Sequence, residues 1–405
     1  MITLDEALHI ALQEAYQTES EVVDLQDSLN RILARDIVTD IDIPPFRKSA
    51  VDGFACRQAD LSLEANHQDA PMGLADKNLL HIIETIHAGK NPEKKIAPHQ
   101  CARIMTGAMV PDGADRVVMV EDTELISEDI VRITGSGKDI NICQQGEDLH
   151  QGAMALKKGI LIRPQEIAIL ASVGASNVQV YELPSIAVIS TGDELVEPHL
   201  VPAPSQIRNS NGYQIMAQLR AINLEPDYSG IVPDDECRLT EMISDAMKDH
   251  SIVILTGGVS VGEYDFVPAV FSKLRAKVLF QKIAIQPGRP TVFARKEGQF
   301  LFGLPGNPVS SFVLCEMLVK PFLLRMMGAT SLPGWIRLPM GQDYSRKRSI
   351  RQILIPVMIK DGAVFPVEYH GSAHIHSYSS ANGILSVPPG ITDIKTGTLV
   401  HVRSL

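Results

Sequence analysis

Two acids follow a glycine-rich turn in the segment 251–265, SIVILTGGVSVGEYD. Residues 251–255 form a short apolar, β-branched run, which predicts a buried parallel strand. The turn over 256–262 precedes an expected helix, and its backbone N–H groups are typical of a site for phosphate or another oxyanion. An acid beside such a site repels the anion unless a cation bridges the two, so Asp265 indicates Mg²⁺. For this segment alone, a tight turn beside a solvated acid is the simpler interpretation.

Further acids fall where neighbouring predicted strands end. Asp193 and Glu194 follow one strand and Asp234 follows another, so we expect them to converge with Asp265 at one edge of a sheet. Carboxylates placed there suit a hard cation that bridges protein and phosphate. Two alternatives stay open: Asp234 or Asp235 could cap the next helix, and Asp193 could close an Asx-turn.

Two later segments could also bind an oxyanion. In 282–290, KIAIQPGRP, the cations Lys282 and Arg289 would offset the acids, although surface cations beside a Pro-Gly turn are the simpler interpretation. In 303–311, GLPGNPVSS, Pro308 suits the first turn of a helix, whose free N–H groups favour an anion. Such a turn is more often structural than catalytic.

Strands and helices alternate through the part of the chain that carries these residues. This alternation predicts a parallel sheet covered by helices on both faces, with ligands at the carboxyl ends of the strands. The expected strands are 186–190, 228–232, 252–255 and 278–285, and the expected helices are about 212–222, 235–248, 266–274 and 308–326.

The segments 46–144 and 331–405 are expected to be β-rich, the second as a small β-barrel or sandwich. Expected strands are 21–25, 79–86, 117–120, 130–133, 352–359, 363–367 and 399–402, and expected helices are 27–33 and 164–173.

The N-terminus is expected to begin with an amphipathic helix. Thr3 and Glu6 form a capping box, and Leu4, Leu8 and Leu12 would form the apolar face.

Length and composition restrict the class of protein. A chain of 405 residues with 45% hydrophobic and 21% charged residues is globular, and two to four domains are expected. The net charge of −11 argues against a generic nucleic-acid binder. The N-terminus lacks the basic region of a signal peptide, and no apolar run is long enough for a membrane span. The five cysteines lie far apart without a CxxC pair, which is typical of reduced thiols in a cytoplasmic protein.

Together, these motifs resemble those of the MoeA family of molybdopterin molybdenumtransferases, which is similar to the E domain of gephyrin. The motifs that carry the resemblance occur in this order and span most of the chain: SAVDGFA, RIMTGA, GED, STGDEL, TGGVSVGEYD, QPGRP and GLPGNPVSS.

The resemblance implies an enzyme that inserts molybdenum from molybdate into adenylylated molybdopterin, with Mg²⁺, and releases AMP and the molybdenum cofactor. It implies a homodimer that works with other enzymes of the same pathway. It also implies a multidomain α/β fold with a cleft shared between subunits. The expected parts are a discontinuous N-terminal domain (1–42 and 145–183), a β-rich inserted domain (43–144), a three-layer α/β/α molybdopterin-binding domain (184–330) and a C-terminal β-barrel (331–405).

The resemblance also assigns roles to individual residues. The implied catalytic residues are Asp52, Thr106, Glu194, Asp234, Asp265 and Lys282, and the implied Mg²⁺ ligands are Asp265, Asp234 and Glu194. The implied substrate-binding residues are Thr256, Gly257, Gly258, Ser260, Arg289, Pro305, Pro308, Arg348 and Ser372. The chain departs from some members of the family, which have lysine at the positions of Gln286 and Arg289. After Arg348, Ile350 and Arg351 replace an expected acidic–aromatic pair.

Two other functions remain as alternatives. Adenylyl transfer to molybdopterin would use a similar α/β domain, but the additional N-terminal and C-terminal segments argue against it. A non-catalytic scaffold, a role that gephyrin also has, is disfavoured because the acids are all in place.

Overall fold

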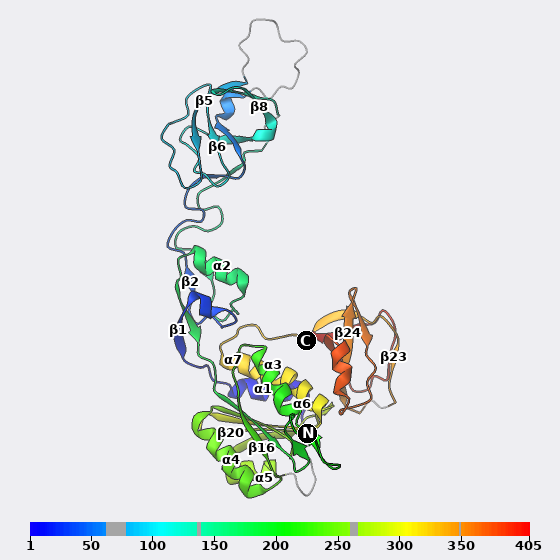
Figure 1. Cartoon of the computed structure of the whole chain (residues 1–405). Helices are drawn as coiled ribbons and strands as arrows, with labels where there is room; N and C mark the ends of the chain where they lie inside the picture. The colour runs from blue at the N-terminus through cyan, green and yellow to red at the C-terminus, as the bar shows by residue number, and fades with distance from the viewer. Residues whose placement is uncertain (62–77, 136–138, 260–265, 348–349) are drawn as a thin grey trace. The chain divides into compact units, whose positions relative to one another are not determined.

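A computed structural model of the chain describes residues 1–61, 78–135, 139–259, 266–347 and 350–405 (Figure 1). The chain divides into two compact units. Unit 1 consists of Met1–Arg35, Lys158–Ile167 and Asn177–Leu405, and unit 2 of Asp36–Lys157 and Ala168–Ser176. The division into four domains stays a prediction. Among the helices of the described residues, none is both long and apolar enough to cross a membrane.

The central sheet of unit 1 has six strands and carries the candidate site. Its order is β16 (Asp227–Val232), β13 (Ile186–Thr191), β17 (Ile252–Thr256), β21 (Gln299–Leu304), β20 (Pro290–Lys296) and β18 (Lys277–Lys282). The first four of these strands are mutually parallel, as the alternating pattern predicts.

The expectation of a wholly parallel sheet is wrong at its other edge. Strands β20 and β21 form an antiparallel hairpin, and β18 pairs antiparallel with β20. The hairpin turn is Glu297 and Gly298, both with positive φ, which matches the twist that tight hairpins require. The single strand expected over 278–285 is also divided, because the chain leaves this sheet after Lys282 and pairs elsewhere as β19 (Ile285–Gln286).

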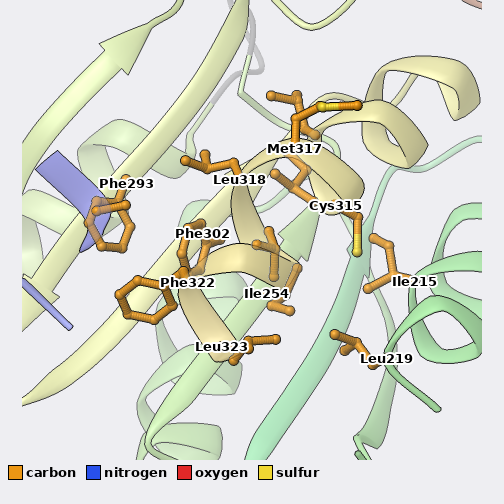
Figure 2. Close-up of a cluster of buried hydrophobic side chains, with 14 of the residues drawn as sticks. Ile215, Leu219, Ile254, Phe293, Phe302, Cys315, Met317, Leu318, Phe322 and Leu323 are labelled. Carbon is orange, nitrogen blue, oxygen red and sulfur yellow. The ribbon is translucent and has the colours of Figure 1, made fainter. Parts of the chain in front are cut away.

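Helices cover both faces of the central sheet, as predicted. One face packs against α1 (Leu4–Glu14), α3 (Asn211–Arg220) and the helical run α6 (Pro308–Leu314), π-helical η4 (Cys315–Val319) and α7 (Lys320–Met326). The other face packs against α4 (Glu236–Asp249) and α5 (Val267–Lys273). Alternate residues of β17 supply the two cores: Ile252 and Ile254 face the first, Val253 and Leu255 the second. Figure 2 shows Ile254 among the side chains of the first core.

The N-terminal helix begins at the predicted capping box, in which Thr3 and Glu6 exchange side-chain-to-backbone bonds. Leu4 of the predicted apolar face is buried, together with Ala7 and Ala11, whereas Leu8 and Leu12 are only partly buried.

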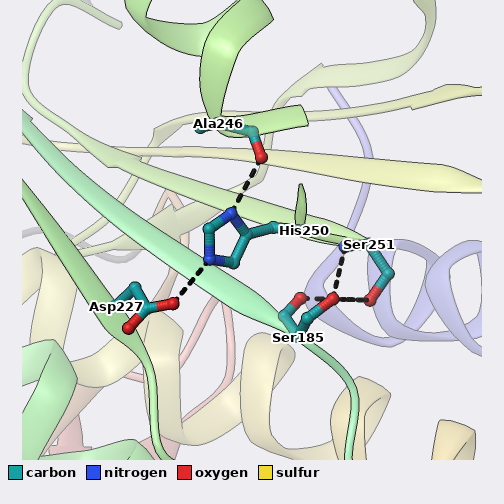
Figure 3. Close-up of polar contacts among 5 residues, drawn as sticks. All are labelled: Ser185, Asp227, Ala246, His250 and Ser251. Carbon is teal, nitrogen blue, oxygen red and sulfur yellow. Dashed lines mark hydrogen bonds and ion pairs between the residues drawn. The ribbon is translucent and has the colours of Figure 1, made fainter. Parts of the chain in front are cut away.

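Polar contacts hold the C-terminal end of α4 against the sheet (Figure 3). The His250 ring contacts the Ala246 carbonyl through Nδ1 and the Asp227 carboxylate through Nε2, each at 2.8 Å. The backbone N–H of Ser251 donates to the Ser185 hydroxyl at 2.9 Å. These contacts lie at the amino ends of the parallel strands, opposite the edge that the acids occupy.

The C-terminal part of unit 1 is a second sheet of six strands. It runs β19, β24 (Gln352–Lys360), β26 (Gly383–Val387), β28 (Leu399–Ser404) and β22 (Ile336–Pro339), with β25 (Ala363–Pro366) beside β24. A bridge between Met340 and Val364 joins the end of β22 to β25, so the sheet closes around its own apolar core. This arrangement agrees with the predicted barrel.

Unit 2 contains the predicted β-rich segment. Its sheet runs β7 (Arg116–Met119), β4 (Gly53–Cys56), β6 (Gln100–Ile104), β5 (Leu79–Ile86), β9 (Ile130–Ile133) and β8 (Thr123–Ser127). Gly53 is required where β4 meets β7, because a Cβ there would lie 1.9 Å from the Val118 carbonyl oxygen.

Shorter elements complete both units. The helix expected over 27–33 is instead the 3₁₀ turn η1 (Leu25–Ser28), and Ile32 and Leu33 are extended and pair as isolated bridges.

The remaining strand pairs are β1 (Ser20–Asp24) with β12 (Asn177–Tyr181), β2 (Ile37–Val38) with β11 (Met154–Leu156), β3 (Lys48–Ser49) with β10 (Ile142–Cys143), β14 (Leu195–Val196) with β15 (Ile207–Arg208), and β23 (Tyr344–Ser345) with β27 (Asp393–Ile394). The other helical elements are α2 (Pro164–Ser172) and the 3₁₀ turns η2 (Gln58–Asp60), η3 (Val120–Asp122) and η5 (Ile375–Ser380).

Candidate active site

A pocket of about 690 Å³ opens at the carboxyl ends of the parallel strands. We call it the acid pocket. It brings together many of the predicted site residues, namely Glu194, Asp234, Thr256, Gly257, Gly258, Pro305 and Pro308. They come from the segments after β13, β16, β17 and β21, so the sheet gathers residues that are far apart in sequence.

Asp234 is half-buried in this pocket and is not a helix cap. Its Oδ1 accepts a hydrogen bond from the Thr191 hydroxyl at 2.9 Å, and its backbone N–H donates to the Asp193 carboxylate at 3.2 Å. The cap of α4 is the neighbouring Asp235, whose carboxylate accepts from the Arg238 N–H at 2.8 Å. The capping alternative therefore applies to Asp235 and leaves Asp234 available for a ligand.

Glu194 is the second acid that lines the pocket, and its side chain is exposed. Its carboxylate lies against Gly192, where a Cβ would come within 2.6 Å of Oε2. Carboxylate oxygens suit Mg²⁺, which usually keeps several water ligands and needs few from protein. Glu194 and Asp234 therefore fit part of a Mg²⁺ site, although among the described residues no group of three or more His, Cys, Asp or Glu is placed to hold a metal.

The glycine-rich turn differs from its predicted role in one respect. The N–H of Gly257 donates to the Leu304 carbonyl at 3.0 Å, so this group does not face a phosphate. Gly257 has a φ of 103°, and a Cβ there would lie 2.2 Å from the Thr191 carbonyl oxygen. Gly257 thus allows two strand ends to approach closely, and Gly258 is left as a described residue of this turn that could donate to phosphate.

Asn211 was not predicted, yet it links two walls of the acid pocket. Its side chain is buried, and Nδ2 donates to the Thr256 hydroxyl at 3.0 Å and to the Gly306 carbonyl at 2.7 Å. Thr256 is itself only 1% exposed, so its hydroxyl holds the turn and does not face the pocket opening. The sequence signal was the pair Asn209 and Asn211 just before the helix expected over 212–222, which is typical of capping residues and does not by itself indicate a site.

Replacing Asn211 with alanine should raise the KM for the substrate of the acid pocket about 10-fold, because two hydrogen bonds that hold its walls are lost. Steady-state kinetics would measure this. Asn382→Ala is a matched control, since Asn382 also makes two bonds, both with the Ile359 backbone in the C-terminal sheet. A control variant with the same rise in KM would show that the effect reflects general loss of stability.

A smaller pocket of about 170 Å³ adjoins the acid pocket and shares Pro290, Pro305 and Asn307 with it. We call it the basic pocket. It is lined from the α/β part by Arg289 and Ser310, and from the C-terminal sheet region by Gln286, Arg351, Tyr369 and Ser372. The predicted residues Arg289 and Ser372 therefore lie together, and two guanidinium groups make the pocket suitable for a small oxyanion.

The amino end of α6 is less available to an anion than the sequence indicates. The Val309 N–H, in the first turn of this helix, donates to the Ser372 carbonyl at 3.0 Å. This bond ties the GLPGNP turn to the C-terminal part of the unit.

Lys282 is absent from the described lining of both pockets. It ends β18, and its carbonyl accepts from the Ile2 N–H at 3.2 Å. The predicted residues Ser260, Asp265 and Arg348 lie outside the described residues.

Asp52 and Thr106 lie together in unit 2. The backbone N–H and the hydroxyl of Thr106 both donate to Asp52 Oδ1 at 2.6 Å. These hydrogen bonds stabilise the ionised carboxylate and lower the pKa of Asp52 below its usual value. The pair therefore presents a fixed negative charge.

Replacing Thr106 with valine should raise the pKa of Asp52, because the hydroxyl donor is lost. Carboxyl carbon NMR across acid pH would follow the titration, and Thr106→Ser should keep the low pKa. Since the folded-state pKa is the depressed one, the stability gained from these bonds should be present above the usual carboxyl pKa and lost as pH falls through the Asp52 value. An unchanged Asp52 titration in the valine variant would contradict the hydrogen-bond assignment.

Comparisons with known proteins cover nearly the whole chain. A family model described as the MoeA N-terminal region (domain I and II) matches residues 2–174, one described as a probable molybdopterin binding domain matches 187–325, and one described as the MoeA C-terminal region (domain IV) matches 337–405.

Individual relatives agree with the family models. A molybdopterin molybdenumtransferase of Staphylococcus aureus is 36% identical over 99% of this chain and 95% of its own length, and one of Staphylococcus epidermidis is 35% identical over the same shares. The crystal structure of a molybdopterin biosynthesis MoeA protein from Pyrococcus horikoshii OT3 matches all of this chain and all of its own, with a TM-score of 0.80 and 28% identity.

Proposed function

Because the chain belongs to the MoeA family of molybdopterin molybdenumtransferases, we propose that it inserts molybdenum from molybdate into adenylylated molybdopterin and releases AMP and the molybdenum cofactor. The observation that carries this proposal is the pair of adjoining pockets. The acid pocket, with Glu194 and Asp234, suits a cation-bound phosphoanhydride. The basic pocket, with Arg289 and Arg351, suits a small oxyanion such as molybdate.

In the acid pocket, Asp234 and Glu194 would hold Mg²⁺ together with Asp265. When bound, this ion would neutralise the charge of the phosphoanhydride that joins AMP to the pterin phosphate. Thr191 keeps the Asp234 carboxylate oriented through its hydroxyl. Gly258, with Ser260 from the same turn, would donate to phosphate oxygens. Positioning and electrostatics would then supply most of the rate.

In the basic pocket, Arg289 and Arg351 would hold molybdate beside the dithiolene of the bound pterin. We assign the oxyanion to these arginines rather than to Lys282, and we retain Arg348 and Ser372 as proposed contributors. As the two dithiolene sulfurs bind molybdenum, one oxygen of molybdate leaves as water with the two thiol protons. Water cleaves the phosphoanhydride, giving AMP and leaving one phosphate on the pterin.

The remaining features of the proposal concern assembly and location. We propose a cytoplasmic homodimer in which Asp52 and Thr106 of a second copy complete the cleft. Membership of this family also implies transfer of substrate and product to and from other enzymes of the same pathway.

Adenylyl transfer to molybdopterin is the second candidate function, because the α/β part alone would serve it. The matches to MoeA-specific N-terminal and C-terminal regions disfavour it. A scaffold without catalysis is disfavoured by the paired pockets.

The test is AMP release from adenylylated molybdopterin by the purified protein, with and without molybdate and Mg²⁺. Release that requires both, with formation of active cofactor, is the expected result. Formation of adenylylated molybdopterin from ATP and molybdopterin would support the second candidate instead. Folded protein without any turnover would favour the scaffold.

A further inference from the structure

A pocket of about 640 Å³ lies at the amino ends of the parallel strands, at the edge of the central sheet opposite the acid pocket. It is bounded by the end of α5, the start of β18 and the turn between β20 and β21. We call it the hairpin pocket. The proposed reaction does not use it.

Positive side chains dominate the lining of the hairpin pocket. The lining contains two acids, Glu14 and Glu297, against five cations, namely Lys273, Arg275, Lys277, Arg295 and Lys296. The chain as a whole has a net charge of −11, so this excess of positive charge is local. A concave surface lined mainly by one sign of charge concentrates ions of the opposite sign.

Only part of this charge is neutralised within the described residues. Arg295 forms an ion pair with Glu14, and Lys273 forms one with Glu236 at 2.8 Å. The cations of the lining that pair with no described carboxylate are Arg275, Lys277 and Lys296. Their charges remain available to a ligand.

The position of Lys277 is unfavourable for the protein alone. In the antiparallel pair of β18 and β20, Lys277 lies directly opposite Arg295. Like charges in directly opposite positions destabilise a sheet, and the nearby carboxylate of Glu14 pairs with Arg295. An anion bound beside the two strands would offset this repulsion.

Arg275 also occupies a position that costs stability. It follows the end of α5 with a φ of 58°, a left-handed conformation at which glycine is usual. The N–H of Ala276 donates to the Phe271 carbonyl at 2.8 Å and closes the end of the helix. The turn thus places an arginine, rather than a glycine, in the lining of the pocket.

We propose that the hairpin pocket binds an acidic segment of a partner protein. Its described lining contains one apolar residue, Leu274, and no aromatic ring, so a nucleobase would find no surface on which to stack. The cations lie on separate elements and have long side chains, which suits an extended chain that carries several carboxylates.

The two acids in the lining favour a peptide over an inorganic polyanion. A polyphosphate presents only acceptor oxygens, so Glu14 and Glu297 would repel it. A peptide has backbone N–H groups as well as carboxylates, so it can donate to these acids while its own carboxylates contact the cations. Because the pocket and the acid pocket lie at opposite edges of the sheet, a docked partner would leave the proposed active site open.

Binding of a short peptide of alternating glutamate and glycine to the full-length protein, measured by isothermal titration calorimetry at low ionic strength, tests the proposal. The same peptide with glutamine in place of glutamate should bind at least about 10-fold more weakly. The double variant Lys277→Gln/Lys296→Gln should bind the glutamate peptide about 10-fold more weakly than wild type, because two ion pairs are lost. The matched control is Lys90→Gln/Lys95→Gln, which removes the same charge from two exposed lysines of unit 2 and should bind as wild type does.

A second readout separates a binding role from a structural one. Lys277→Gln removes the repulsion from Arg295, so its free energy of unfolding without peptide should equal or exceed that of wild type. Urea titration would measure this. A clear loss of stability in Lys277→Gln would mean that Lys277 supports the fold, and it would overturn the binding role.

Other results would also overturn the proposal. No binding of the glutamate peptide at millimolar concentrations would do so, as would equal binding by wild type and the double variant. Binding of tripolyphosphate that depends on Lys277 and is tighter than that of the peptide would make the pocket a small-anion site. A changed oligomeric state of the double variant in sedimentation velocity would make a second copy of the chain the occupant. None of these outcomes depends on the proposed reaction.

Discussion

Replacing Asp234 with asparagine should reduce Mg²⁺-dependent AMP release by about 10²- to 10³-fold, the loss typical of removing a group that stabilises developing charge. The substitution removes one negative charge from the acid pocket and changes the shape of the side chain little. The amide oxygen can still accept from the Thr191 hydroxyl, so the local fold should persist. AMP release measured across a range of Mg²⁺ concentrations should show a higher half-saturating concentration as well as a lower maximum.

The adjacent Asp235 provides the matched control. It is exposed and caps α4, and asparagine caps helices about as well as aspartate. Asp235→Asn should therefore keep both stability and turnover. Equal losses of AMP release in the two variants would indicate a general effect of charge at this edge of the sheet. Normal turnover in Asp234→Asn would remove Asp234 from the proposed metal site.

The parts of the fold that the sequence predicts are those with a regular pattern. A short β-branched run that ends at a glycine-rich turn, such as Ile252–Thr256, favours a buried strand over a helix, and the helices between such strands have a clear apolar face. Because parallel strands end at one edge of the sheet, placing the strands also predicts that Glu194 and Asp234 share a pocket.

The features that were missed depend on contacts between distant segments. The hairpin of β20 and β21 turns at Glu297 and Gly298, and although the glycine suits such a turn, glutamate seldom adopts a left-handed conformation, so the local signal is weak. Gly257 was assigned to phosphate binding from its position in a turn, but its N–H is bonded to Leu304, a residue of another strand. Asn211 was missed for the same reason, because its partners lie 45 and 95 residues away in sequence.

The strand ends that form the acid pocket depend on the aromatic core beneath them, in which Phe322 lies beside Phe293 and Phe302 (Figure 2). Its side chain is fully buried, and its ring meets Phe293, Phe300 and Phe302 edge-on at 5.5, 4.8 and 5.2 Å between centroids. Phe322→Ala should lower the free energy of unfolding of this part of the chain by about 3–5 kcal/mol, because it removes a buried ring and leaves a cavity. Urea titration followed by the fluorescence of Trp335, the only tryptophan, would measure the loss.

Trp335 is a suitable probe because it packs, partly buried, against the same core as Phe322. Phe322→Leu is the matched control: it keeps most of the apolar volume, so it should lose less than half as much stability as the alanine variant. Similar losses in both variants would mean that edge-on ring contacts, rather than filled volume, stabilise the core. An alanine variant as stable as wild type would mean that α7 can collapse onto the sheet and close the cavity. Strand β21 carries Phe300 and Phe302, and it ends at Leu304, beside Pro305 in the wall of the acid pocket. We therefore also expect the Phe322→Ala variant to lose substrate affinity at temperatures below its unfolding transition.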